Sequence, residues 1–367
     1  MKTNQKNLYE IGAVCFKLGC FGFGGIAGMI GLIESEIVSQ RRWISHEQYV
    51  DVVGAANIIP GPNSVEIIMH CSHHRGGKAG LIVGGIAYIL PATLICLIWA
   101  FLYSKYGYLP SVQPFLAGIR PAVIAIIIAA VFRLSKPAFK NVHIIIISLL
   151  VLIGSLFGMN EVVLLFAAGI IGTLYLNRKQ LYSWFPAPLL FINNFNSKLF
   201  FIFLKIGAIL YGSGYVLFAY LDDALVQRNH WLTKHQLTDA IAVGQITPGP
   251  ILSSATFAGY LINGTTGALL ATIGIFLPSF FIAFFLHRFL NFINRHQLLR
   301  NFLDIVNGAS VALIAAVAIH MFTGIAQEWQ SDIILLLCLL AVFLVKRMNT
   351  ALLIVFGSVG GYLLSLV

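Results

Sequence analysis

The chain has few charged residues for its length. Only 10% of its 367 residues are Asp, Glu, Lys or Arg, whereas a typical soluble domain contains about 25%. Hydrophobic residues make up 59% of the sequence, and the mean hydropathy is +0.88. These values exclude an ordinary soluble protein and predict an all-α polytopic membrane protein. The net charge of +10 is spread over short loops, where cations set the orientation in the bilayer, so we predict no nucleic-acid partner.

The sequence also lacks the motifs of a metal site or of a common enzyme. Its five cysteines show no paired metal-ligand spacing, and they predict neither a disulfide framework nor a zinc site. Neither an HExxH nor a GxSxG motif is present. We therefore predict that the protein is not an enzyme and that it uses no metal or cofactor. Residues 1–7 lack the pattern of a cleavable signal peptide, so we expect the first apolar segment to be retained.

The sequence does contain an internal repeat. The stretch Trp43–Asp51, followed by Pro60-Gly61-Pro62, returns as Trp231–Asp239, followed by Pro248-Gly249-Pro250. Trp231 lies 188 residues after Trp43, and a nearly constant offset holds over much of each half. A duplicated membrane unit is the plan of many secondary transporters. The sequence therefore predicts two membrane domains, residues 1–188 and 189–367.

Ten apolar segments are candidate membrane spans. They are 8–32, 80–103, 114–132, 143–157 and 161–176 in the first copy, and 199–221, 267–286, 302–322, 332–345 and 351–367 in the second. If the Pro-Gly-Pro segments do not cross the membrane, fifteen of the 23 Lys and Arg residues fall on one side and five on the other, as the positive-inside rule requires. If the segments cross, the two sides hold about ten each. We therefore predict two inverted-topology repeats, with about ten crossing helices and two broken or re-entrant Pro-Gly-Pro segments.

A short helix is predicted before each Pro-Gly-Pro. Ser45 with Gln48, and Thr233 with Gln236, form capping boxes, in which hydroxyl and amide groups satisfy the first N–H groups of a helix. From Ser45 to Ile59 the helix would be roughly 22 Å long, less than the ~30 Å of a hydrocarbon core. Proline removes a donor and clashes with the preceding turn, so each helix is expected to end inside the membrane. The chain would then return as a second half-helix.

These breaks mark the predicted substrate site. Irregular backbone at membrane depth has to line a polar cavity, because lipid cannot satisfy its hydrogen bonds. A half-helix that begins at Pro62 or Pro250 directs unpaired N–H groups and its positive dipole end inward, which favours an anion. The alternative is a kink with a structural role only. The residues assigned to anion binding at the breaks are Pro60, Gly61, Pro62, Asn63, Ser64, Pro248, Gly249, Pro250 and Ser253.

Three cations lie inside predicted spans. Lys17 and Lys205 occupy equivalent positions, whereas Arg120 is matched by the neutral Asn307. A charge at membrane depth costs at least about 2.5–3.5 kcal/mol, so each cation is expected to face water or a partner. Snorkelling to the interface is the alternative. We assign all three to anion binding, because opposed copies bring the lysines to a shared axis and a guanidinium suits oxyanions. Asp239 is expected to pair with a lysine or to lie at the interface.

Small residues and one acid complete the predicted site. Gly24 and Gly25 in the first copy, and Gly212 in the second, follow the two lysines. Residues without bulk permit either close helix contact or a break in the helix, and both interpretations stay open. Glu66, just beyond the first Pro-Gly-Pro, is the candidate for proton coupling.

These motifs resemble those of the chromate transporter family, and the resemblance covers nearly the whole chain. It implies a bacterial plasma-membrane carrier with two homologous halves in opposed orientation, and some members export chromate, with sulfate a related oxyanion. Many members continue Phe-Gly-Gly with proline and a nearby histidine, whereas here Ile26 follows and residues 27–33 contain no histidine. The family motif points to Phe23, Gly24, Gly25, Trp43, Pro60, Gly61, Pro62, Trp231, Pro248, Gly249 and Pro250.

The main functional hypothesis is a secondary transporter of a small oxyanion, either chromate or a sulfate-like anion, in the bacterial plasma membrane. An anion channel of the same architecture is the first alternative. A membrane-embedded hydrolase that uses Glu66 and His70 is the second, although no catalytic motif favours it. The expected partners are a small inorganic anion and membrane lipid, and a homodimer is left open.

Overall fold

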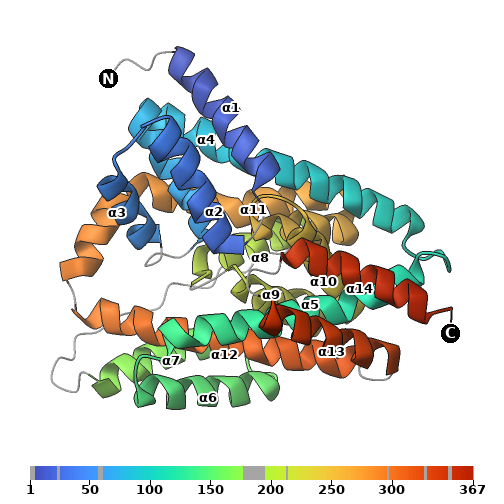
Figure 1. Ribbon diagram of the computed structural model, residues 1–367. Helices are drawn as coiled ribbons and strands as arrows, with labels where there is room; N and C mark the ends of the chain where they lie inside the picture. Colours follow the sequence, from blue (N-terminus) through green and yellow to red (C-terminus); the bar gives the residue numbers. More distant parts are fainter. Residues whose placement is uncertain are drawn as a thin grey trace.

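The structure is a computed structural model that describes residues 5–22, 25–56, 61–176, 195–211, 214–295, 297–325, 329–345 and 349–366. Within these residues all regular structure is helical (Figure 1). In chain order the elements are α1 (Gln5–Phe21), α2 (Gly25–Ile33), η1 (Glu34–Gln40), α3 (His46–Ala56), α4 (Asn63–Tyr106), α5 (Gln113–Ala138), α6 (Val142–Leu156), α7 (Glu161–Leu176), α8 (Phe195–Ile209), α9 (Val216–Leu221), η2 (Asp222–Arg228), α10 (Lys234–Ile246), η3 (Ile251–Ser253), α11 (Ser254–Arg295), α12 (Gln297–Ile325), α13 (Trp329–Leu344) and α14 (Thr350–Leu364).

Eight of these helical stretches are apolar enough to lie in a membrane. Four are also long enough to cross it, namely Asn63–Tyr106, Gln113–Ala138, Ile251–Phe285 and Leu298–Thr323. Four are shorter, namely Val142–Leu156, Glu161–Tyr175, Trp329–Leu344 and Thr350–Leu364. The eight stretches coincide with eight of the ten predicted spans. The chain is therefore an all-α, multi-pass membrane protein, and the number of crossings stays a prediction.

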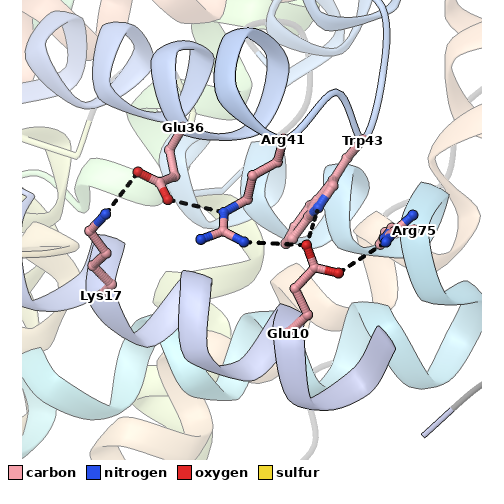
Figure 2. Close-up of polar contacts among 6 residues, drawn as sticks. All are labelled: Glu10, Lys17, Glu36, Arg41, Trp43 and Arg75. Atoms are coloured by element: carbon pink, nitrogen blue, oxygen red, sulfur yellow. Dashed lines mark hydrogen bonds and ion pairs between the residues drawn. The ribbon is translucent and has the colours of Figure 1, made fainter. Parts of the chain in front are cut away.

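The remaining predicted spans, 8–32 and 199–221, are wrong as single helices. In the first, α1 ends at Phe21, and the chain reverses before α2 continues into η1. Lys17 Nζ on α1 lies 3.0 Å from Glu36 Oε2, and Arg41 Nη1 lies 3.3 Å from Glu10 Oε1, so α1 and η1 run antiparallel (Figure 2). Hydropathy cannot distinguish a straight apolar helix from one that folds back at its glycines, which explains the error.

The second repeat contains the same hairpin. The ring of Phe195, at the start of α8, lies 5.0 Å from that of Trp231, which follows η2. Near the other end of the hairpin, the Tyr220 hydroxyl donates a hydrogen bond to the Ile209 carbonyl at 3.4 Å. Helices α8 and α9 therefore also run antiparallel, with the break between them at the tip of the hairpin.

A second hairpin follows in the first repeat. The Ser45 and Gln48 capping box is present, with hydrogen bonds of 3.0 and 3.2 Å, and helix α3 begins directly after Ser45. Trp43, just before this helix, donates its indole N–H to Glu10 Oε1 at 3.3 Å, and Arg75 in α4 lies 3.0 Å from Glu10 Oε2. The chain thus enters and leaves this hairpin beside the same carboxylate. We call this region, where Glu10, Trp43 and Arg75 meet, the Trp43 end.

The second repeat builds its second hairpin from α10, η3 and the start of α11. The Thr233 and Gln236 capping box is again present. Asn263 donates to Asn196 Oδ1 at 2.8 Å, and Lys198 Nζ lies 5.4 Å from the centre of the Trp231 ring. The chain therefore also enters and leaves this hairpin at one place. We call the region where Asn196, Trp231 and Asn263 meet the Trp231 end.

A sharp turn inside α4 and another inside α11 join each hairpin to a long helix. Gly77 has φ +62° and Gly264 has φ +55°, backbone angles that glycine adopts without a side-chain clash. The helix 78–106 begins at the Trp43 end and reaches the Trp231 end, where Tyr103 donates to Asp239 Oδ2 at 2.7 Å. The helix 265–295 starts at Gly264 and passes Lys78, whose Nζ lies 4.8 Å from the Phe284 ring centre. The two long helices thus connect the two ends of the molecule.

The remaining helices form a layer along one side of the molecule. Figure 1 shows α5, α6, α7, α12 and α13 lying alongside one another, opposite α1 and the long part of α4. Residues 122–127 of α5 are all apolar and at most 1% exposed, so this part of the helix is buried on all sides and forms part of the core. Gly118 of α5 packs against Gly357 and Gly361 of α14, where no side chain would fit.

Candidate oxyanion site

The tips of the hairpins from both repeats surround one small cavity. Its volume is about 50 Å³, larger than the ~30 Å³ that a water molecule occupies in the liquid and far smaller than the roughly 300–1,000 Å³ of drug-sized pockets. It can therefore take a small ion and excludes a large organic substrate. The lining residues are Gly22, Met29, Pro62, Asn63, Ser64, Gly214, Gly244, Gln245, Thr247, Gly249, Pro250, Ile251, Leu252 and Thr350.

Two backbone hydrogen bonds tie the repeats together at this cavity. The N–H of Gly61 donates to the Leu210 carbonyl at 2.7 Å, and the N–H of Gly249 donates to the Gly22 carbonyl at 3.0 Å. Gly61 and Gly249 are repeat equivalents, and so are Gly22 and Leu210. Each Pro-Gly-Pro tip therefore satisfies a carbonyl that the helix break of the other repeat has freed. Residues at equivalent positions in the two repeats thus form two matching hydrogen bonds across the cavity.

The glycine in each Pro-Gly-Pro is required by its backbone conformation. Gly61 has φ +138° and Gly249 has φ +100°, a region that L-residues with side chains rarely adopt. A Cβ atom on Gly249 would also lie 3.0 Å from Ala92 Cβ, and one on Gly61 would collide with the Glu66 carboxylate. The prolines on both sides remove amide donors, so the helices end here and α4 starts afresh after Pro62.

The cavity offers neutral hydrogen-bonding groups. Helix α4 begins at Asn63 and the helical turn of η3 begins at Ile251, so two positive helix ends meet there. Asn63, Ser64, Gln245 and Thr247 bring polar side chains to its wall. Within the described part of the chain, its lining contains no charged side chain. Such a site can hold an anion through dipoles and hydrogen bonds without a fixed counter-charge.

Sequence reasoning missed Gln245. Its side chain is only 7% exposed, and its Nε2 has no hydrogen-bond partner among the described residues. A buried amide donor without a partner is costly unless a ligand or water satisfies it. One signal was available, because Asn57 occupies the equivalent position in the first repeat, three residues before its own Pro-Gly-Pro. Asn57 itself lies outside the described residues.

The predicted binding residues at the breaks fall into three groups. Pro62, Asn63, Ser64, Gly249 and Pro250 line the cavity, and Gly61 holds its tip in place from behind. Ser253 is fully buried and donates to the Pro250 carbonyl at 2.7 Å, so it supports the turn, and Pro248 does not line the cavity. Gly25 begins α2, just after the first break. Gly24, Pro60 and Gly212 lie outside the described residues.

The two lysines predicted for the site do not line the cavity. Lys17 is bonded to Glu36, and its side chain is 56% exposed. Figure 2 shows that it belongs to a chain of polar contacts at the Trp43 end, in which Arg41 links Glu36 to Glu10. Lys205 lies on an exposed face of α8. The structure thus gives Lys17 a carboxylate partner in place of an anionic substrate.

Arg120 is also placed away from the cavity. Its Nε and Nη2 atoms donate to the two carboxylate oxygens of Asp239, each at 3.1 Å. Asp239 is 2% exposed and also accepts the Tyr103 hydroxyl at 2.7 Å. This two-point ion pair joins α5 to the hairpin helix α10. The sequence predicts that Asp239 pairs with a lysine or lies at the interface, and the partner in the structure is this arginine.

Glu66 lies directly behind the cavity. Its side chain is 1% exposed and rests against Gly61, one of the two cross-bonded tips. Neither carboxylate oxygen has a hydrogen-bond partner among the described residues. A carboxyl group in such surroundings is stable in its neutral, protonated form.

The sequence is similar to one known protein family and to several named proteins. The profile of the chromate transporter family matches residues 9–173 and 197–362, one match in each repeat. The chain is 28% identical to a chromate transport protein of Cupriavidus metallidurans, over 83% of this chain and 80% of that protein. It is 26% identical to a chromate transport protein of Pseudomonas aeruginosa, over 85% and 80%. A probable chromate transport protein of Synechococcus elongatus is 24% identical over 97% and 95%. No solved structure matches.

The two profile matches cover most of the chain, and they divide it where the internal repeat does. Both Pro-Gly-Pro tips and both helix breaks that form the cavity lie within the matched residues. The chain is a membrane transporter and belongs to the chromate transporter family.

Proposed function

We propose that this protein is a secondary transporter that carries a small oxyanion, chromate or a sulfate-like anion, across the plasma membrane of a bacterium. The relatives from Cupriavidus metallidurans and Pseudomonas aeruginosa are named chromate transport proteins. The observation that carries the proposal is the cavity in which two helix ends, two Pro-Gly-Pro tips and the Gln245 side chain converge, whose Nε2 atom has no hydrogen-bond partner among the described residues. An anion that enters it accepts hydrogen bonds from neutral donors at the positive ends of two helices.

Neutral donors suit a carrier because binding has to be reversible on both sides of the membrane. A lysine or arginine in the cavity would add a strong, long-range attraction that slows release. Peptide N–H, amide and hydroxyl groups bind an oxyanion over a short range instead. Asn63, Ser64, Gln245 and Thr247 are the side chains that we assign to this role.

We further propose that the two repeats lie inverted in the membrane, with the Trp43 end and the Trp231 end at opposite faces. Supporting this, the helix 78–106 extends from one end to the other, and its 29 residues span about 43 Å at ~1.5 Å per residue. The hairpins of each repeat then enter from their own face and meet near the middle, as in other inverted-repeat transporters. Arg41 and Arg75 lie at the Trp43 end, which assigns that end to the cytoplasm.

Cysteine labelling tests this orientation. Arg42 and His230 are repeat equivalents near the two ends, and both have positive φ values, +52° and +51°. Arg42→Cys and His230→Cys should react with a membrane-impermeant maleimide from opposite sides of the membrane. Labelling of both from the same side would contradict inversion.

We propose Glu66 as a proton-coupling residue. Its carboxyl is buried beside Gly61 and lacks a hydrogen-bond partner among the described residues, so a change in its protonation would alter the support of one tip. Glu66→Gln retains the shape of the neutral acid. We expect this variant to bind chromate while losing transport that is driven by a pH gradient.

The direct test of transport is a flux assay in proteoliposomes that contain the purified protein. Labelled chromate and sulfate should enter wild-type vesicles faster than protein-free ones. Gln245→Ala and Asn63→Ala should lower the flux by about 10-fold or more, as expected for loss of hydrogen bonds worth about 1.4 kcal/mol or more to the bound ion. Thr93→Ala is the matched control, because this exposed hydroxyl bonds only within its own helix. Equal fluxes in all four proteins would refute the site, and steady single-channel currents would identify a channel.

A further inference from the structure

A second buried polar cluster lies beside η2, away from the cavity. Glu161 at the start of α7 accepts a hydrogen bond from the Ser155 hydroxyl at 3.3 Å. Asp222 and Asp223, the first two residues of η2, lie within electrostatic range of this carboxylate. His320 of α12 places its Nδ1 atom 3.6 Å from Asp222 Oδ2. Four segments of the chain, α6, α7, η2 and α12, thus bring titratable or hydroxyl groups to one place.

The cluster holds more negative charge than the nearby arginine can balance. Arg228 Nε donates to both oxygens of Asp223, at 2.9 and 2.8 Å, so this cation is committed to one acid. Glu161 and Asp222 are only 4% and 3% exposed. Asp222 accepts one hydrogen bond from Gln227 at 3.2 Å. Negative charges on two buried carboxylates near each other repel, and a bound cation would offset this repulsion.

The unpartnered atoms show where this cation would bind. Glu161 Oε2 is buried without a hydrogen-bond partner among the described residues, and so is His320 Nδ1. In the described part of the chain, there is no group of three His, Cys, Asp or Glu residues spaced to hold a metal ion. A proton needs only two such atoms. The 3.6 Å approach of His320 Nδ1 to Asp222 Oδ2, with the buried Glu161 carboxylate in electrostatic range, therefore fits proton binding better than it fits a metal.

The neighbouring elements supply few other titratable groups. The Tyr220 side chain on α9 lies within electrostatic range of Glu161, and its hydroxyl bonds to the Ile209 carbonyl. Among the described residues, the neutral Ser155 of α6 bonds to Glu161, and the other charges of η2 are Asp223 and Arg228, which pair with each other. The groups of the cluster that can exchange a proton are therefore Glu161, Asp222 and His320.

One helix connects this cluster to the cavity. Gly214 lines the cavity, and α9 runs from Val216 directly into η2, which begins at Asp222. The six residues of α9 span about 9 Å. η2 is a π-helix, a form that is rare and frequent at functional sites. A change of charge at Asp222 therefore acts on the same hairpin whose tip forms part of the cavity wall.

We propose that Glu161, Asp222 and His320 form a proton-binding site beside η2, and that its protonation controls transport by moving the α8–α9–η2 hairpin. This inference rests on the proposed transport function. A proton from water binds to the Glu161 carboxyl group, to the Asp222 carboxyl group or to His320. Protonated, the cluster holds η2 against α7 and α12, and when the proton leaves, repulsion between the carboxylates loosens that contact.

The first repeat supplies a matched control. Glu34 is the equivalent of Asp222, but it pairs with His46 at 3.0 Å, where the two side chains are 37% and 67% exposed. Water screens charges at such a surface. Glu34→Gln should therefore leave the response of transport to pH unchanged, whereas Asp222→Asn and Glu161→Gln should alter it.

The experiment is chromate flux into proteoliposomes at equal pH on both sides, from about pH 5 to 8, a range that includes the ordinary pKa of a histidine side chain. Wild type, Glu161→Gln, Asp222→Asn, His320→Gln and Glu34→Gln are compared, and chromate binding to each solubilised protein is measured separately. We expect a pH-dependent flux in wild type and Glu34→Gln, and a flattened or displaced profile in the three cluster variants, with chromate binding retained. Glu161→Asp should restore part of the wild-type profile.

The outcomes separate this inference from the transport proposal. Wild-type vesicles that show no chromate flux at any pH would refute the proposed function. Normal flux with the same pH profile in wild type, Glu161→Gln and Asp222→Asn would refute the proton site alone, as would a wild-type flux that does not vary with pH. If Glu161→Gln fails to fold, then Asp222→Asn and His320→Gln decide, because a displaced profile in either supports the site and unchanged profiles in both overturn it.

Discussion

The Trp43 end and the Trp231 end perform the same structural task with different chemistry. At the Trp43 end, the carboxylate of Glu10 receives hydrogen bonds from Arg41, Trp43 and Arg75 (Figure 2). At the Trp231 end, the residue equivalent to Glu10 is Lys198, which lies over the ring of Trp231. The two hairpins of one repeat are thus joined by ion pairs, and those of the other by an amide pair and a cation–π contact.

This difference shows which features the duplicated fold needs and which are free to vary. The tips keep glycine at equivalent positions, Gly61 and Gly249, because both have positive φ and both bond to the other repeat. The ends require only that the two hairpins stay together, and either ion pairs or aromatic contacts achieve this. Asymmetry between the two faces of a transporter can therefore arise at the ends without change at the shared cavity.

The largest expected difference between equivalent positions concerns the Arg120–Asp239 pair. Arg120→Ala leaves Asp239 buried and unpaired, and we expect it to lower the free energy of unfolding by about 3–5 kcal/mol. In the first repeat, Asp51 is the equivalent of Asp239 and is exposed. Asp51→Ala should therefore change the free energy of unfolding by less than about 0.5 kcal/mol. Denaturant unfolding of the purified proteins in detergent measures both.

A double variant sharpens this prediction. Arg120→Met with Asp239→Leu removes both charges and keeps apolar bulk, so it should be more stable than Arg120→Ala alone. Equal losses of unfolding free energy in Arg120→Ala and Asp51→Ala would show that the buried ion pair of Asp239 contributes no more stability than its exposed equivalent, Asp51.

Substitution of the tip glycine should reduce transport in both repeats. Gly61→Ala and Gly249→Ala each force a side chain into a strained conformation that costs about 1–3 kcal/mol, and both should reduce chromate flux. Gly61→Ala should be the more damaging, because its Cβ would collide with Glu66. Gly31→Ala is the control, since a Cβ there meets no atom within 4 Å and alanine favours the helix. Normal flux in both tip variants would show that transport does not depend on the conformation of the tips.

The Trp43 end should contribute less to the stability of the fold at low pH. Burial alone would raise the pKa of Glu36, but the hydrogen bonds and charges of Lys17 and Arg41 together lower it below the ordinary 4.5. Glu36 lies in η1, outside the helices that are apolar enough to span the membrane. A lowered pKa contributes stability above the pKa of the unfolded chain, and this contribution is lost as the pH falls through the folded-state value.

Glu36→Gln tests this contribution. Its effect on the free energy of unfolding should be about 1 kcal/mol near pH 7, since water screens the partners, whose side chains are 56% and 35% exposed. The difference between wild type and variant should shrink below about pH 4. The second repeat has Ala224 at this position and no equivalent group. A difference that stays constant down to low pH would contradict the ion-pair account.

The smallest effects are expected for the two equivalent lysines. Lys17→Ala removes one partly exposed ion pair and should cost less than about 0.5 kcal/mol. Lys205→Ala, on an exposed face of α8, should cost no more. Chromate flux should stay within about twofold of wild type in both, as for surface positions remote from the site. A large loss of flux in a well-folded Lys17→Ala protein would contradict this prediction and show that Lys17 contributes to transport.

Much of the cavity could be predicted because its signals are local. The capping boxes at Ser45 and Thr233 determine where the half-helices begin, and Pro62 and Pro250 determine where they are interrupted. The repetition of these signals in both halves indicated a shared site. The neutral amide of Gln245 was missed because it lies inside α10, before the Pro-Gly-Pro that marks the break.

The remaining features depend on contacts between distant segments. Lys17 and Arg120 were expected to bind substrate because their partners, Glu36 and Asp239, lie 19 and 119 residues away along the chain. The reversal between α1 and α2 was missed because its apolar residues read as one continuous span. Hydropathy reports where the chain is buried in lipid, and it does not report the direction in which the chain runs.

The central claim is that both repeats together hold the oxyanion between their Pro-Gly-Pro tips. Crystals of the protein grown with chromate, measured at the chromium absorption edge, would locate the ion through its anomalous scattering. The account predicts one chromium peak in the cavity, between Asn63 and Gln245. A peak beside Lys17 or Arg120, with the cavity empty, would contradict it.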